Sequence, residues 1–349
     1  MRPTFSIIAF TVLSGIGYGA WFLFGLGAAI GPACSAGGLS GPSGATLTSC
    51  HAPFDSFAAL LVASACVAVG LLCSLGHLGK PQRAWRAVSQ WRTSWLSREG
   101  AIALLTFVPA AVLVVRYGLA LQSPTDGVAV TELHRWNDAS WDETGNRLLG
   151  GLVALGSLAT VFCTANIYAS LKPIRAWHER HVVPAYLLLG LYGGTLLLHA
   201  TTTLSGATWH RDRLVLLVGT IALAAGCGWI KLRYWRSIDA QSSIAAGQAT
   251  GLETLGVVRA FEAPHTEENY LLHEMGFMLA RKHARALRRI ALVAAFAVPA
   301  LLAAVALALP AVQVAIAWLA LASGLAGLFV ERWLFFAEAK HAVTAYYRR

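Results

Sequence analysis

Charged residues are scarce in this chain. Asp, Glu, Lys and Arg make up 13% of its 349 residues, whereas 56% are hydrophobic. A soluble domain carries about 25% charged residues. Half that density excludes an ordinary soluble globular fold and indicates an integral membrane protein. We therefore count the chain in membrane spans and expect a single membrane-anchor domain over 1–349.

Motifs that hold a cofactor are also missing. The sequence contains no CxxC pair, no glycine-rich phosphate loop and no zinc-ligand spacing, so we expect no metal site in this chain. Four cysteines stand within apolar runs, where a thiol packs as a small hydrophobic group: Cys66, Cys73, Cys163 and Cys227. Cys34 and Cys50 share a loop rich in glycine, proline and serine, and the sequence leaves open whether they form a disulfide.

Long apolar runs, by contrast, are abundant. A membrane-spanning helix needs roughly 20 mostly apolar residues. Eight runs qualify, at about 4–30, 55–79, 99–121, 148–171, 182–203, 213–232, 290–309 and 311–334. They are too long and continuous for the strands of a membrane barrel, and helices satisfy their own backbone groups in lipid. We therefore expect an all-α bundle of eight transmembrane helices, with the last two forming a hairpin at Pro310.

Basic residues gather on one side of these spans. That side holds the N-terminus, the C-terminal tail and the segments 80–98, 172–181 and 231–289. It carries 22 of the 27 Lys and Arg residues, and the other side carries 5. The positive-inside rule makes the basic side cytoplasmic, so both termini are expected there. Topology explains most of the net charge of +10, which leaves little support for nucleic-acid binding.

The longest of the cytoplasmic segments is an insertion at 233–289. Part of it has apolar residues at i, i+4, i+7 and i+8, which is the spacing of one helical face: Leu271, Met275, Met278 and Leu279. This pattern predicts an amphipathic helix at the membrane surface. Such a helix is also compatible with docking of a partner protein.

One short connection is unusually rich in ionisable groups. The stretch from Leu75 to Gly100 reads LGHLGKPQRAWRAVSQWRTSWLSREG and links the second and third spans. We expect His77 near the cytoplasmic end of one helix and Glu99 near the start of the next, with Ser97 as its N-cap. Such a histidine and glutamate can hydrogen-bond a lipid-soluble quinone and exchange protons with water. Residues at helix ends commonly have no such role, so spacing alone leaves both interpretations open.

The motif HLGKPQRAW…SWLSREG resembles the signature of the DmsC family, the membrane-anchor subunits of respiratory molybdoenzymes such as dimethyl sulfoxide reductase. The matching residues are His77, Leu78, Gly79, Pro81, Arg83, Ala84, Ser97 and Glu99. The resemblance implies that His77 and Glu99 bind a quinone (ubiquinone or menaquinone), with Arg83, Trp95 and Ser97 at the same site. It also implies two partners, an iron–sulfur ferredoxin-like subunit and a molybdopterin catalytic subunit, which would supply the iron–sulfur clusters and the molybdenum.

Two C-terminal segments resemble a narrower group. FEAPHTEENYLLHEMGFMLARKHARALRR at 261–289 and ERWLFFAEAKHAVTAYYRR at 331–349 are similar to the anchors of cytoplasmic sulfite-oxidising enzymes, the SoeC type. This similarity implies electron transport from sulfite oxidation to the quinone pool of a bacterial cytoplasmic membrane, with the catalytic partners on the cytoplasmic side. The alternative is the anchor of a dimethyl sulfoxide or related reductase, which oxidises quinol in anaerobic respiration.

Other interpretations have weaker support. Haem b needs two histidines facing each other at one depth, and only His199 stands clearly inside a span, so haem is not expected. A transporter or channel would show interrupted helices and mid-membrane charges in two related halves, whereas the charges here gather at span ends. Glu331 and Arg332 close the last span, where they would reach water, pair with another charge or serve the quinone site.

The uneven distribution of basic residues predicts the topology. A reporter fused after Arg349 should report the cytoplasm, and one inserted within 122–147 should report the periplasm. Paired reporters, each active on only one side of the membrane, measure this directly. The opposite pattern would contradict a cytoplasmic docking face.

Overall fold

The computed structural model describes residues 4–30, 53–76, 80–120, 139–204, 210–241, 246–258, 261–262 and 278–342. Within these ranges the regular secondary structure is entirely helical, and eight helices are long and apolar enough to cross a membrane. The predicted all-α fold with eight spans is therefore confirmed. Cys34, Cys50 and most of the predicted surface helix, including Leu271 and Met275, lie outside the described residues.

The spans follow one another as α1 (Phe5–Ile30), α2 (Pro53–Leu75), α3 (Trp95–Ala120), α5 (Ala139–Ala169), α6 (Val182–Thr202), α7 (His210–Ala240), a seventh span and α12 (Gln313–Ala337). The seventh combines α10 (Met278–Leu292), η3 (Val293–Ala297) and α11 (Val298–Ala308). Shorter elements are η1 (Pro81–Gln90), α8 (Ala246–Thr250), η2 (Glu253–Leu255) and η4 (Pro310–Val312), which turns the chain at Pro310 as predicted.

Several helices are longer than the apolar runs that predicted them. α5 begins at Ala139 rather than near 148, α7 continues to Ala240 rather than 232, and the seventh span begins before 290. α2 is instead shorter, since its last residue is Leu75 rather than 79. The three longer helices arise because apolar composition marks only the lipid-facing length, whereas the backbone hydrogen bonds of a helix continue into the polar interface.

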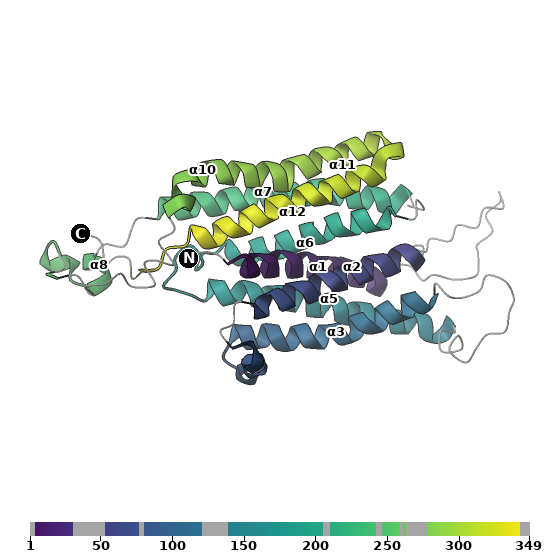
Figure 1. The fold of residues 1–349 in the computed structure, drawn as a ribbon, viewed down its shortest axis with the longest axis horizontal. Helices are drawn as coiled ribbons and strands as arrows, with labels where there is room; N and C mark the ends of the chain where they lie inside the picture. Colours follow the sequence, from purple (N-terminus) through teal and green to yellow (C-terminus); the bar gives the residue numbers. More distant parts are fainter. Residues whose placement is uncertain are drawn as a thin grey trace.

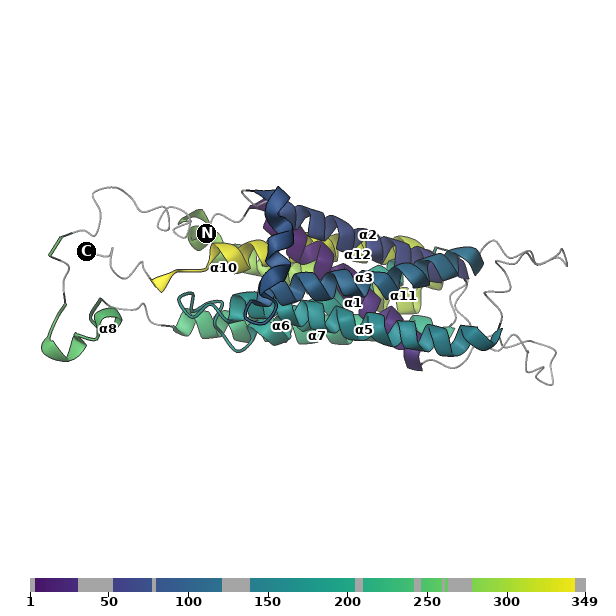
Figure 2. The same ribbon diagram turned by 90° about the horizontal axis from the view of Figure 1, so that it is seen from below.

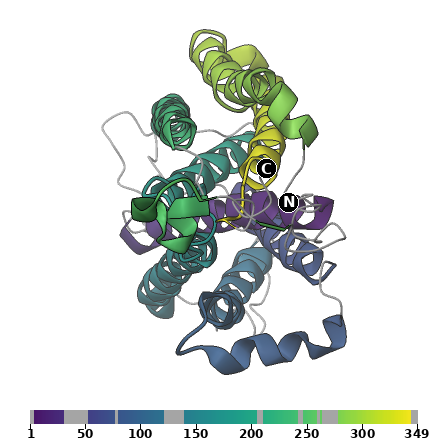
Figure 3. The ribbon, with the colours of Figure 1, turned by 90° about the vertical axis from the view of Figure 1, so that its left-hand side faces the viewer.

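α1 and α6 form the centre of the bundle. They are the most buried of the spans, and α1 packs against α2, α5 and α6. α3 packs on α2 and α5 on one side, and α7, α11 and α12 gather beyond α6 on the other (Figures 1 and 3). α1 begins and α12 ends at the same end of the bundle (Figure 1). We call this the N/C end.

η1 runs across the bundle axis at the N/C end (Figure 2). Arg83 and Arg86 are exposed on it, and the Trp85 side chain is 70% exposed. The Arg86 guanidinium carbon lies 5.5 Å from the centre of the Trp85 ring. Tryptophan and arginine side chains on a segment parallel to the membrane plane are typical of the headgroup level.

α1 and α6 cross with their backbones in contact. A Cβ added to Gly19 would lie 1.8 Å from the carbonyl oxygen of Gly190, and one added to Gly194 would lie 2.2 Å from the backbone carbon of Gly19. Membrane helices associate closely at such small residues because the hydrophobic effect does not drive them together in lipid. The crossing therefore requires glycine at these positions.

The seventh span contains a π-helical turn, η3, next to Pro299. Proline has no N–H to donate to the carbonyl of Ala295, four residues earlier. The Tyr192 hydroxyl on α6 donates to that carbonyl, and Ser323 on α12 donates to the Ala294 carbonyl at 2.8 Å. Side chains of two neighbouring helices thus satisfy backbone groups within the apolar bundle and fasten the seventh span to α6 and α12.

The α1–α6 crossing gives a stability prediction. Gly19→Ala should destabilise the protein by about 1–3 kcal/mol or more, because the new methyl group overlaps the backbone of α6. Gly27→Ala on the same helix is the matched control, since its Cβ would meet nothing within 4 Å, and alanine favours a helix over glycine. Thermal unfolding in detergent measures both. Equal unfolding temperatures for the two variants would contradict the close crossing.

Candidate functional site

α3 is capped by Ser94 rather than by Ser97. The helix begins at Trp95, and the Ser97 N–H donates to the Ser94 hydroxyl at 3.4 Å, as expected for an N-cap serine. The predicted cap was wrong because the helix extends two residues into the interfacial segment before Ser97. Ser97 is buried, and its hydroxyl donates to the Ala87 carbonyl of η1. Glu99 consequently lies deeper in the helix than predicted.

Glu99 is buried against α5, with 4% of its surface exposed. The Thr164 hydroxyl on α5 donates to its carboxylate. That hydroxyl also lies 3.0 Å from the carbonyl oxygen of Thr160. A hydroxyl has only one proton to donate, so Thr164 has two acceptors to choose between. This arrangement can accommodate both protonation states of Glu99 without movement of the backbone.

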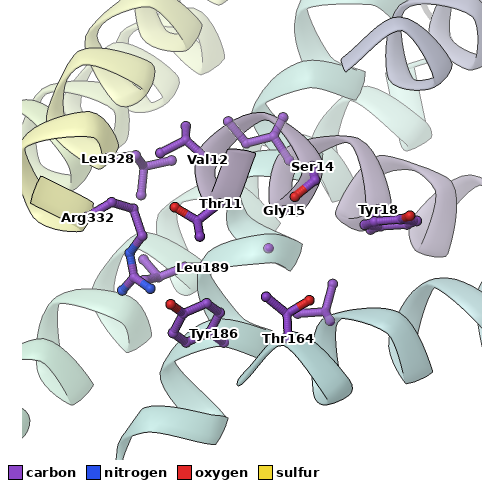
Figure 4. A pocket seen from close by; sticks show the side chains of 13 residues that line it. Thr11, Val12, Ser14, Gly15, Tyr18, Thr164, Tyr186, Leu189, Leu328 and Arg332 are labelled. Carbon is purple, nitrogen blue, oxygen red and sulfur yellow. The ribbon is translucent and has the colours of Figure 1, made fainter. Parts of the chain in front are cut away.

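A pocket lies between α1, α5, α6 and α12, with about 460 Å³ of empty volume including the part open to its surroundings (Figure 4). Its lining is mostly apolar, and its polar side chains are Thr11, Ser14, Tyr18, Thr164, Tyr186 and Arg332. Thr164 and Arg332 stand near the C-terminal ends of α5 and α12, and Tyr186 stands near the start of α6. The pocket is therefore near the N/C end of the bundle.

Two tyrosine hydroxyls in this lining are not fully satisfied, although Thr160 lies close to Tyr18 and Arg332 lies close to Tyr186. Tyr18 and Tyr186 are 2% and 6% exposed, and within the described residues neither hydroxyl makes a hydrogen bond of normal geometry. The hydroxyls of Thr11 and Ser14, by contrast, bond to carbonyls of their own helix. A buried polar group without a partner costs about 1–3 kcal/mol. The two tyrosines are thus available donors for a ligand with acceptor oxygens.

A cluster of three buried charges adjoins the pocket through Arg332. Lys231, Glu331 and Arg332 are 1%, 0% and 4% exposed. The Lys231 ammonium nitrogen lies 2.5 Å from Glu331 Oε1, and Arg332 Nη2 donates to the same oxygen at 2.7 Å. Arg332 Nε donates to Glu331 Oε2. The cluster holds two cations and one anion, so its net charge is +1.

Aromatic rings complete the surroundings of the two cations. The Lys231 nitrogen lies 4.1 Å from the centre of the Tyr234 ring. The Arg332 guanidinium carbon lies 4.4 Å from the centre of the Tyr186 ring and 4.8 Å from that of Phe335. The negative face of an aromatic ring attracts a cation, more strongly when water is excluded. These rings compensate for part of the excess positive charge.

The residues proposed from sequence occupy different places. Glu99 contacts the pocket through Thr164, which is one of the lining residues. Trp95 packs edge-on against Phe162 of α5, with ring centres 5.9 Å apart. Arg83 is exposed on η1, and His77 lies outside the described residues. Among the described candidates, only Glu99 is linked to the pocket by a hydrogen bond.

The comparisons with known proteins agree with this architecture. The family model for the DMSO reductase anchor subunit, DmsC, matches residues 55–120. A sulfite dehydrogenase subunit of Allochromatium vinosum is 30% identical over 359 aligned positions, which cover 100% of this chain and 99% of that protein. The chain belongs to the DmsC family of anchor subunits. No solved structure matches this DmsC-family anchor.

The part that matches the DmsC model covers α2, η1 and α3, and therefore Glu99. Every described residue that lines the pocket comes from helices outside this match. Thr164, Tyr18 and Tyr186 did not stand out in the sequence, because hydroxyl side chains are common in membrane helices. Lys231 could have been identified from the sequence, because it is an ionisable residue within an apolar run. Glu331 and Arg332 were recognised, and the structure pairs them with each other and with Lys231.

A second ion-pair group closes the N/C end beside the cluster. Arg288 of α10 binds Asp239 of α7 at 2.6 Å and Glu338, which follows α12, at 2.9 Å. Burial raises the pKa of the Glu338 carboxyl, and Arg288 partly opposes this change. These contacts hold α7, α10 and α12 together where the chain leaves the bundle.

The charged cluster predicts an order of stabilities in this DmsC-family anchor. Glu331→Gln should destabilise it by about 3–5 kcal/mol, because two buried cations then face each other. Lys231→Met should cost less, since the Glu331–Arg332 pair remains neutral. Arg233→Met, at an exposed position two residues away, should change stability by no more than about 0.5 kcal/mol. Chemical unfolding in detergent measures the relative stabilities of the three variants.

The double variant Lys231→Met with Glu331→Gln tests whether repulsion between the two buried cations causes the loss of stability in Glu331→Gln. It leaves Arg332 as the single cation of the cluster, so it should regain part of the stability that Glu331→Gln loses. If Glu331→Gln unfolds at the same denaturant concentration as Arg233→Met, the cluster has no structural importance.

Proposed function

We propose that this anchor exchanges electrons between a membrane quinone and an iron–sulfur subunit docked at the N/C end, which in turn serves a molybdopterin catalytic subunit. The hydrogen bond from Thr164 to Glu99 carries this proposal, because it connects a buried carboxylate to the lining of a largely apolar pocket. Family membership favours such an anchor over a transporter or channel. In this proposal the anchor has no redox cofactor of its own.

The chemistry of the pocket lining suits a quinone headgroup. Ligand pockets in proteins typically combine an apolar lining with a few well-placed polar groups. A quinone headgroup is a flat apolar ring whose two oxygens accept hydrogen bonds. The unpartnered hydroxyls of Tyr18 and Tyr186 are donors of the required kind. Ubiquinone and menaquinone share this chemistry, so the lining does not distinguish them.

Protons must accompany the electrons. Reduction of a quinone takes up two electrons and two protons, and oxidation of a quinol releases them. Glu99 is the group we assign to proton transfer, with Thr164 holding its carboxylate toward the pocket. Its position near the start of α3 and the N/C end shortens the path to water. His77 stays a predicted second ligand at this site.

We assign the substrate of the partner subunit to sulfite. This assignment follows the similarity to the Allochromatium vinosum sulfite dehydrogenase subunit over the whole chain. In the complete reaction, sulfite and water would give sulfate, and the two electrons and two protons released would convert one quinone to one quinol. The reverse direction of electron flow, from quinol to a sulfoxide, is the alternative.

We place the partners on the cytoplasmic side of a bacterial inner membrane. The basic side of the chain is the N/C end, where η1 presents Arg83 and Arg86 on its exposed surface. Complementary charge on a partner would guide docking to this end. Electrons would then pass directly between a docked cluster and the quinone near Glu99.

The Glu99→Gln variant tests this function in the purified complex. It keeps the size of the side chain and removes the titratable group. Quinone reduction driven by sulfite should fall by roughly 10²–10⁴-fold, as for loss of a general acid–base. Sulfite oxidation with a soluble electron acceptor should be unchanged, because that assay bypasses the anchor. Asp55→Asn is the matched control, a buried carboxylate at the opposite end of the bundle, and it should leave both rates intact.

Variants at Thr164 distinguish the contribution of its hydroxyl to quinone turnover from that of its side-chain packing. Thr164→Val should lower quinone turnover, and Thr164→Ser, which keeps the hydroxyl, should restore most of it. Normal quinone turnover in both Glu99→Gln and Thr164→Val would contradict the site. If sulfite does not reduce a quinone analogue even in the unmodified complex, the substrate assignment is wrong.

A further inference from the structure

The pocket has polar groups at two separate places. Figure 4 shows Arg332 and Tyr186 together on one side of the pocket, and Thr164 and Tyr18 on the other. Glu99 stands behind Thr164, whereas Glu331 and Lys231 stand behind Arg332. The first side therefore has a cation beside it, and the second has a carboxylate.

Arg332 commits two of its three nitrogens to Glu331. Nε and Nη2 both donate to that carboxylate, and Nη1 takes part in neither bond. The guanidinium group is rigid and planar, so its two bonds to Glu331 fix the direction of Nη1 as well. Glu331 in turn is held by Lys231 at 2.5 Å. The cluster thus acts as a support that positions one donor.

The charge of the cluster determines which ligands it favours. Glu331 faces both Lys231 and Arg332, and Glu338 of the neighbouring ion-pair group also acts on Lys231. An anionic oxygen in the pocket would give the Arg332 guanidinium a second anionic partner. Hydrogen bonds between charged groups contribute about 1.5–3 kcal/mol, roughly 10- to 100-fold in affinity.

We propose that Arg332 and Tyr186 bind one oxygen of the ligand, opposite the Tyr18 and Thr164 side, and that the site therefore prefers ligands with negative charge on that oxygen. This inference rests on the proposed quinone function. It assigns Arg332 as a ligand-binding residue and Glu331 and Lys231 as its positioning residues. It also gives the pocket an orientation, in which the carboxylate of Glu99 is near one oxygen and the cation is near the other.

A pair of naphthoquinones tests the charge preference. 2-Hydroxy-1,4-naphthoquinone is an anion at neutral pH, and 1,4-naphthoquinone is neutral and otherwise nearly identical. Binding to the purified complex is measured by quenching of tryptophan fluorescence, without turnover. The unmodified complex should bind the anion roughly 10- to 100-fold more tightly than the neutral compound. A ratio near one in the unmodified complex would overturn the proposal.

Arg332→Gln should bring that ratio close to one, mainly by weakening binding of the anion. It leaves Lys231 and Glu331 as a neutral pair, so the buried charges stay balanced. Arg332→Lys keeps the charge and should retain most of the preference, which covers the case in which Arg332→Gln fails to assemble. Tyr186→Phe should weaken both compounds, the anion somewhat more, and should leave most of the preference in place because Arg332 remains.

Arg233→Gln is the matched control, an exposed arginine on α7 that does not line the pocket, and it should change neither affinity. If Arg332→Gln keeps the full preference for the anion, Arg332 does not bind the ligand. Failure of the proposed function itself looks different. In that case neither naphthoquinone would bind to the unmodified complex, whatever residue stands at 332.

Discussion

A charge inside an apolar bundle has to be paired, and the N/C end of this protein is organised around that requirement. Lys231, Glu331 and Arg332 come from two helices and are almost completely buried. Taking such groups out of water costs several kcal/mol each unless partners compensate. The ion pairs and the rings of Tyr234 and Tyr186 supply that compensation. The packing of α7 and α12 at this end therefore depends on the three charges being in register.

Uncharged polar groups in the bundle also need partners, and some hydroxyl groups have one whereas others do not. Thr11 and Ser14 satisfy themselves on their own helix, and Tyr192 satisfies the carbonyl that Pro299 leaves free. Tyr18 and Tyr186 have no such partner within the described part of the chain, although they are equally buried. Unpaired donors in a close-packed membrane bundle are costly. Both tyrosines line the same pocket, and this is one support for the proposal that a ligand binds there.

Close helix crossings make the pocket possible. Gly19 and Gly194 allow α1 and α6 to touch through their backbones, so α1 runs through the centre of the bundle. From that position α1 contributes Tyr18 to a lining that α5, α6 and α12 complete. Glu99 reaches the same region from α3 through Thr164. The pocket and Glu99 thus involve five helices, from α1 near the start of the chain to α12 near its end.

The sequence by itself determined the all-α class, the eight spans and the hairpin at Pro310, because apolar length and helix-breaking residues are local properties of the chain. It also singled out Glu99, from the motif at the start of the third span, and Glu331 and Arg332, as ionisable residues at the end of the last span. Only the tertiary structure decided which of these residues meet. The partners Thr164 and Lys231 are 65 and 100 positions away from Glu99 and Glu331, and side chains so distant are brought together by helix packing, which no local pattern encodes. The cap at Ser94 was likewise decided by where the α3 backbone begins, because two serines three residues apart offer the same local signal and only the hydrogen bonds distinguish them.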